Sequence, residues 1–121
     1  MQILEKMENI QIKRIYDEPS EDDGYRVLVD RLWPRGVSKA SAHLDEWNKE
    51  VAPSTELRKW FDHKEERFND FAILYQEELL VKEDELIKLR EISKSENVTL
   101  LYGAKDPKIN HAIVLKKVLL K

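Results

Sequence analysis

The chain has 121 residues, no cysteine and a formal net charge of −3, and 37% of its residues are charged. This length fits one domain with one ordinary core. The absence of cysteine excludes disulfides, thiol catalysis and thiolate metal sites. The densest charge cluster, within residues 17–23, is acidic. That cluster disfavours nucleic-acid binding, because nucleic-acid binders usually carry a basic face.

The sequence has no apolar stretch of the roughly 18 residues that a membrane span needs, so we expect no membrane partner. Residues 1–9 are charged and too short in apolar length to resemble a signal peptide. We therefore expect a cytoplasmic protein with an N-terminal tail at residues 1–9 and a single α/β domain at residues 10–121.

Two strands are predicted in the first third of the chain. Isoleucines alternate with polar residues across 10–16, which predicts a strand with one wetter face. A nearly continuous apolar run across 25–32 predicts a strand buried on both faces. The connection between them is too short for a parallel crossover between neighbours. These strands are therefore either antiparallel or not adjacent, and the sequence leaves both arrangements open.

Helices dominate the middle of the chain. Ser38 predicts the N-cap of a short helical turn, and Ser54 caps a helix through Phe61. Residues 44–51 fit either an extended segment or a helix. The capping-box spacing of Asp62 and Glu65 predicts a helix over about residues 63–80, followed by another over about 82–94. The first of these has an apolar face made of Phe68, Phe71, Leu74, Tyr75 and Leu79.

The last part of the chain predicts a buried strand at 98–103 and a final helix ending near Lys121. Asp106 as N-cap and Pro107 at the first helical position indicate where that helix starts. The order of elements predicts an α/β fold, with a short, mostly parallel sheet of strands near 10–16, 25–32 and 98–103 packed by helices.

Two turns then lie side by side at the carboxyl edge of this sheet, where open α/β proteins usually bind ligands. Their charged, aromatic and amide side chains predict a site for an anion, namely a phosphate, nucleotide or carboxylate. The candidate binding residues are Arg31, Trp33, Arg35, Lys105 and Asn110. Asp30 and His111 are the candidate catalytic acid–base pair, since histidine titrates near neutrality.

Each candidate also has a structural interpretation. Asp30 and Arg31 fit a local ion pair, Trp33 fits a packing role, and Asp106 fits a cap better than a catalyst. The sequence does not decide whether the protein is an enzyme. The alternative is a non-enzymatic binding or regulatory module that contacts a protein or nucleic-acid partner through exposed tryptophans.

No metal or cofactor is expected, because the three histidines lack metal-ligand spacing and no phosphate loop or nucleophile elbow is present. A homodimer is compatible with the sequence.

Four motifs resemble a known family: DRLWPRGV at 30–37, DEW at 45–47, APSTELRKWF at 52–61, and LLYGAKDP with NHA at 100–112. Over about residues 10–120 the chain resembles the small YeaO-like proteins of domain of unknown function family 488. The resemblance implies a compact cytoplasmic bacterial or archaeal α/β protein. It supplies no reaction, substrate or catalytic residue.

Overall fold

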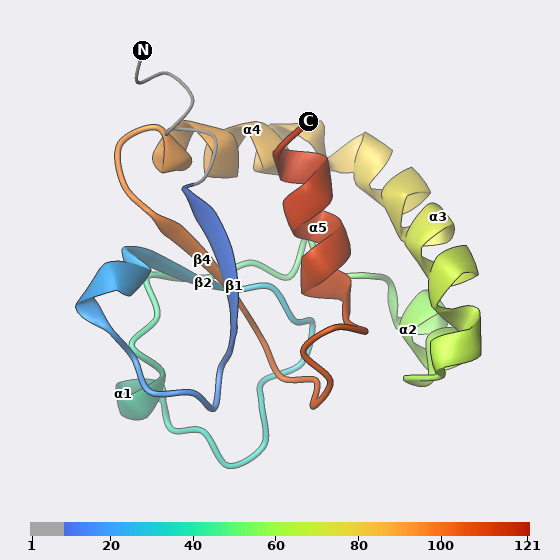
Figure 1. The fold of residues 1–121 in the computed structure, drawn as a ribbon, viewed down its shortest axis with the longest axis horizontal. Helices are drawn as coiled ribbons and strands as arrows, with labels where there is room; N and C mark the ends of the chain where they lie inside the picture. Colours follow the sequence, from blue (N-terminus) through green and yellow to red (C-terminus); the bar gives the residue numbers. More distant parts are fainter. Residues whose placement is uncertain (1–8) are drawn as a thin grey trace.

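Four parallel strands form the centre of the molecule in the computed structural model, which describes residues 9–121 (Figure 1). They are β1 (Ile10–Arg14), β2 (Tyr25–Leu28), β3 (Glu46–Trp47) and β4 (Val98–Tyr102), in the order β1-β4-β2-β3. The predicted α/β class with a mostly parallel sheet is confirmed. Within residues 44–51, which fitted either an extended segment or a helix, Glu46–Trp47 form the short strand β3 and the segment ends in a turn. The predicted tail lies outside the described residues, except for Asn9.

The first two strands are parallel and not adjacent, because β4 lies between them and pairs with both. All five residues of β4 are buried, as expected for a central strand with cover on both faces. Strand β1 is an edge strand, and four of its five residues are partly exposed. The polar residues that predicted a wetter face in this strand are therefore explained by its position at the edge of the sheet.

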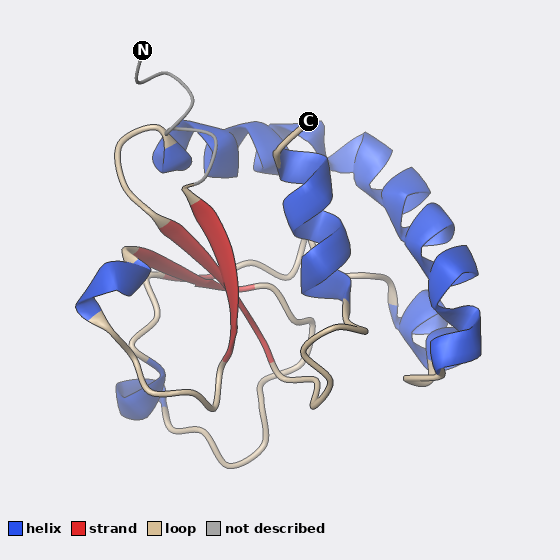
Figure 2. Cartoon of the chain, viewed as in Figure 1, coloured by secondary structure: helices blue, strands red, loops and turns tan. Residues whose placement is uncertain are grey.

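Helices cover one face of the sheet, and a thinner layer of loop and short helix covers the other (Figures 1 and 2). The helical layer contains α2, α3, α4 and α5, and the opposite layer contains α1. Short 3₁₀ turns η2, η3 and η4 connect these elements. The bounds are η2 (Glu21–Asp23), α1 (Lys39–Ala42), α2 (Thr55–Phe61), η3 (Glu65–Arg67), α3 (Phe68–Leu79), η4 (Leu80–Lys82), α4 (Glu83–Ser93) and α5 (His111–Leu119). None of the helices within residues 9–121 combines the length and apolar character of a membrane span.

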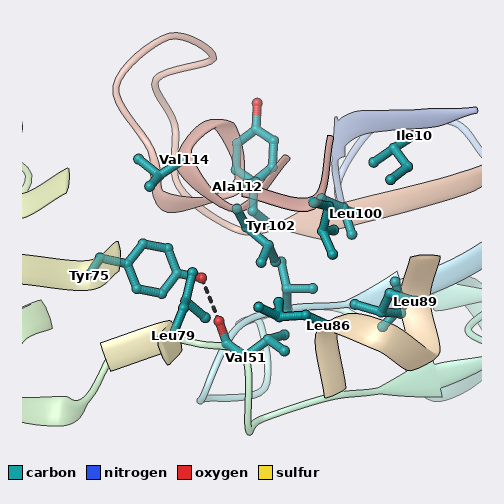
Figure 3. Close-up of a cluster of buried hydrophobic side chains, with 14 of the residues drawn as sticks. Ile10, Val51, Tyr75, Leu79, Leu86, Leu89, Leu100, Tyr102, Ala112 and Val114 are labelled. Atoms are coloured by element: carbon teal, nitrogen blue, oxygen red, sulfur yellow. Dashed lines mark hydrogen bonds between the residues drawn. The ribbon is translucent and has the colours of Figure 1, made fainter. Parts of the chain in front are cut away.

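Tyr75 belongs to the larger core, and its hydroxyl donates a hydrogen bond to the carbonyl of Val51 (Figure 3). The side chain is fully buried. Burial, and secondarily the negative charge of Asp30, raise the pKa of Tyr75 well above its usual value. The hydroxyl therefore remains a neutral donor and fixes the backbone between β3 and α2 against α3.

The opposite face of the sheet contains a buried ion cluster. Asp23 accepts from Arg26 Nη1 at 2.5 Å, from Lys13 Nζ at 3.1 Å and from the backbone N–H of Ser20 at 3.0 Å. Burial raises the pKa of Asp23, but the hydrogen bonds from these three donors outweigh it, so the pKa is lowered overall. Arg26 also donates to two carbonyls around α1, so this cluster attaches the thin layer to the sheet.

The predicted N-caps at Ser38 and Ser54 are confirmed, since each side chain accepts from a backbone N–H three residues later. The predicted capping box at Asp62 is wrong. Asp62 is left-handed, with φ 50°, and ends α2 by donating its N–H to the carbonyl of Arg58. Helix α3 begins six residues later, and Leu74 on the predicted apolar face is 42% exposed.

Candidate functional site

A pocket of about 200 Å³ lies where β2 and β4 end, bounded also by the start of α5, by α2 and by α3. We call this hollow the pocket. Its polar lining is Asp30, Arg31, Arg58, His63, Asn110 and His111. Its apolar lining is Leu32, Pro53, Phe61, Phe71, Gly103 and Ala104.

The topology explains this location. After β2 the chain continues towards β3, whereas after β4 it enters α5, which packs over β4 and β1. The two connections leave neighbouring strands in opposite directions. Such a switch point opens a crevice at the carboxyl ends of parallel strands.

The carboxylate of Asp30 joins the ends of the two strands. Its Oδ2 accepts from the backbone N–H of Gly103 at 2.8 Å, and its Oδ1 lies 3.0 Å from Nε2 of His111. A Cβ at Gly103 would lie 3.0 Å from Oδ2. A side chain at this position would therefore push against the carboxylate, so the close approach favours glycine.

His111 is the first residue of α5, and its Nε2 lies 2.9 Å from the carbonyl oxygen of Val29 as well as 3.0 Å from Asp30 Oδ1. Both neighbours are acceptors, so Nε2 carries a hydrogen. The hydrogen bond is formed with the Val29 carbonyl, and Asp30 Oδ1, although close to the same nitrogen, is a buried acceptor without a hydrogen bond of its own in the described part of the chain.

The predicted helix start at Asp106 and Pro107 is wrong, and α5 begins four residues after Pro107. The carboxylate of Asp106 accepts from the N–H groups of the second and third following residues at 2.8 and 3.1 Å, which forms a turn rather than a helix. Asn110 is the N-cap instead. Its Oδ1 accepts from Ile113 N at 3.1 Å, and its Nδ2 donates to the carbonyl of Asp106 at 2.9 Å.

Arg31 is fixed by backbone carbonyls rather than by its acidic neighbour. Its Nε donates to the carbonyl of Pro53 at 3.0 Å and its Nη2 to that of Ala52 at 3.2 Å. Within residues 9–121 it forms no ion pair with Asp30. The carbonyl before these two, of Val51, is held by Tyr75. The core thus positions the guanidinium of Arg31 through three consecutive peptide groups.

Sequence reasoning missed two nitrogen-bearing side chains of the pocket, Arg58 and His63. Arg58 forms no ion pair or side-chain hydrogen bond within residues 9–121, and its Nε is buried without a partner. It lies three residues before Phe61 on α2, so it shares a helix face with a buried aromatic ring. That spacing is the signal in the sequence that could have identified it.

His63 occupies an unusual backbone position. Both it and Asp62 have positive φ, 55° and 50°. Left-handed backbone is costly for residues other than glycine and is concentrated at functional sites. The strained pair turns the chain after α2 and brings His63 to the pocket.

Three predicted binding residues do not line the pocket. Trp33 donates its Nε1 hydrogen to the carbonyl of Val37 at 2.7 Å and packs edge-on against Trp47, with ring centroids 5.2 Å apart. These contacts give Trp33 the packing role that the sequence offered as the alternative to ligand binding. Arg35 and Lys105 are exposed. Of the seven predicted residues, the structure brings Asp30, Arg31, Asn110 and His111 together in the pocket.

The lining has more cationic than anionic groups. Arg31 and Arg58 share the lining with the single carboxylate of Asp30. The lining contains no serine, threonine or cysteine. Nowhere in residues 9–121 do three or more histidine, aspartate or glutamate side chains gather as a metal site would require. The lining therefore offers two guanidinium groups, one carboxylate, one amide and two imidazoles as hydrogen-bonding groups.

Comparison with known proteins gives relatives across nearly the whole chain. The chain is 51% identical to uncharacterised protein YeaO of Escherichia coli K12 over 107 residues, which cover 88% of this chain and 93% of YeaO. It is 42% identical over 110 residues to uncharacterised proteins of Mycobacterium bovis and Mycobacterium tuberculosis, covering 91% of this chain and 92% of each relative. No solved structure matches.

The sequence model described as "Inactive DUF488-N3 subclade" matches residues 9–121. This match includes all four motifs that suggested the resemblance. The chain belongs to the DUF488 family, within its N3 subclade.

Proposed function

We propose that this protein binds a small anionic molecule in the pocket and holds it without chemical conversion. One observation carries the proposal. Within residues 9–121, the buried side-chain polar atoms without a hydrogen-bond partner are Arg58 Nε and Asp30 Oδ1, and both residues line this pocket. Buried polar atoms are normally paired, so two unpaired ones in the same hollow favour a binding site.

An anion would complete the environment of Arg58. Arg58 is partly exposed, but its Nε is buried, and a buried donor is costly unless an acceptor faces it. Its planar donors match the geometry of a carboxylate or phosphate. Arg31 supports the same ligand, because its hydrogen bonds to Pro53 and Ala52 fix the guanidinium before any ligand arrives. This preorganisation lowers the entropic cost of binding.

Two features favour binding over catalysis. The lining offers no hydroxyl or thiol nucleophile. The matching family model carries the description "inactive". We assign Asp30 and His111, the candidate catalytic pair, a positioning role: they connect the ends of β2 and β4 to the start of α5.

The test is thermal unfolding in increasing sodium phosphate, with sodium chloride added to hold ionic strength constant. Binding to the folded state stabilises by about 2.7 kcal/mol at 100 times Kd. For a chain of this length that corresponds to a rise in Tm of about 10 °C. Arg58→Gln should abolish the saturable part of this rise.

Lys59→Gln is the matched control, because it removes one positive charge from the next residue of α2, which is exposed and outside the pocket. Phosphate also stabilises proteins through exclusion from their surface, and that effect acts on both variants equally. Equal phosphate responses in the wild type and Arg58→Gln would overturn the proposal.

A further inference from the structure

Apolar residues form half of the pocket's lining. Phe61 and Phe71 are stacked, with ring centroids 4.3 Å apart and planes inclined by 18°. Pro53 and Ala104 add apolar surface, and Leu32, which is 60% exposed, lies at the rim. An inorganic anion would use the cationic groups and leave this apolar surface without a contact.

We infer that the ligand is a small organic anion with a single carboxylate or phosphate group attached to a flat apolar body. The inference rests on the proposed function and specifies its ligand class. Arg58 and Arg31 would hold the anionic group, and the wall around Phe61 would contact the body.

Size and charge both limit the ligand. A volume of about 200 Å³ is below the range of roughly 300–1,000 Å³ typical of pockets for drug-sized ligands and cofactors. The hollow is therefore small for a whole nucleotide. The carboxylate of Asp30 lies in the same lining and would repel a second anionic group. One anionic group and one compact apolar body satisfy both limits.

Matched pairs of probes test the inference. Benzoate is compared with acetate, and phenyl phosphate with methyl phosphate, by isothermal titration calorimetry at constant ionic strength. Each pair keeps the anionic group and changes the apolar body. Burial of about 60 Å² of ring surface corresponds to about a tenfold gain in affinity. We therefore expect the ring compound of at least one pair to bind about tenfold more tightly than its partner.

The preferred pair also identifies the anionic group as carboxylate or phosphate. Arg58→Gln should abolish binding of both members. Leu32→Ser should reduce the preference for the ring several-fold and leave the small anion unaffected. Leu80→Ser, at an exposed leucine outside the pocket, is the matched control and should change neither.

The outcomes separate the two proposals. If acetate or methyl phosphate binds in an Arg58-dependent way and the ring adds no affinity, the inference fails and the proposed function stands. If ring compounds bind more tightly but Arg58→Gln changes nothing, the ring binds elsewhere and the inference also fails. If no anion of either kind binds, the proposed function fails.

Discussion

Replacing Tyr75 with phenylalanine tests whether the core holds the backbone next to the pocket. The substitution removes the hydroxyl that donates to the Val51 carbonyl and leaves this carbonyl buried without its donor. Stranding a buried acceptor costs about 1–3 kcal/mol. Unfolding entropy scales with length, so for 121 residues each kcal/mol lowers Tm by about 4 °C. We expect Tyr75→Phe to lower Tm by about 4–12 °C.

The assay is thermal unfolding followed by circular dichroism, with urea unfolding as a second measure of the free energy. Tyr16→Phe is the control, because the Tyr16 hydroxyl also donates to a carbonyl, that of Arg35 at 2.8 Å, but the side chain is exposed. Its effect should stay within about 0.5 kcal/mol. If the two variants lost the same stability, the Tyr75 hydrogen bond would not have the role assigned to it.

Three further predictions concern other parts of the fold. Gly103→Ala should destabilise by about 1–3 kcal/mol in urea unfolding, because the new Cβ would meet the Asp30 carboxylate at 3.0 Å. The pKa of Asp23 is lower in the folded protein than its ordinary value of 3.8, so the ionised carboxylate stabilises the fold at any pH above 3.8. This stabilisation is lost as the pH falls below 3.8 and through the lower pKa of the folded protein. Asp23→Asn should therefore lose stability at pH 7 and show a shallower decline in stability below pH 4. Arg90→Met should cost about 1–3 kcal/mol in thermal unfolding, since Arg90 donates to the last carbonyls of α5.

Two of these predictions have a matched comparison. Asp22→Asn changes an exposed neighbour of Asp23 and should retain the wild-type acid profile; identical profiles for both variants would contradict the assignment. Lys94→Met removes only an exposed ion pair with Glu91 and should cost less than about 1 kcal/mol. Arg90→Met must lose more stability than Lys94→Met. For Gly103→Ala, unchanged stability would show that the carboxylate does not need the space.

The sequence predicted the strands well because their signals are local. The apolar run of β4 favours a strand in any context, and the run at 25–32 predicts β2. The predicted end is wrong: β2 stops at Leu28, and Leu32 is 60% exposed. The order of the sheet has no such signal. Strand β4 lies between β1 and β2 in the sheet but follows β2 by some seventy residues in the chain. No short motif encodes the pairing of β4 with these two strands, so the sequence did not predict which strands are neighbours.

Two capping predictions failed for the same physical reason. Asp62 and Asp106 both have sequence features of a helix start, but a short acidic side chain also suits a helix end and an isolated turn. Asp62 ends α2 in the left-handed conformation, and Asp106 forms a turn. The buried Asn110 takes the N-cap of α5, because its amide can both cap the helix and bond back to that turn.

The pocket was only half predictable. The ends of β2 and β4 must meet if the strands are parallel neighbours, which correctly located Asp30, Arg31 and His111. Arg58 enters from α2, and its approach depends on how helices pack on the sheet. The carbonyls that fix Arg31 lie in a loop. Every residue has a backbone carbonyl, so the sequence does not indicate which carbonyls accept from Arg31.

The central claim is that the Arg58 guanidinium receives the anionic group of a ligand. Nitrogen-15 labelling of arginine and titration with sodium phosphate, at constant ionic strength, would follow this group directly by NMR. We predict that the Nε–H resonance of Arg58, assigned with Arg58→Gln, shifts saturably. The resonance of Arg90, which is bonded to α5 and lies outside the pocket, should stay in place. An unmoved Arg58 resonance, or equal non-saturating shifts of both arginines, would contradict the account.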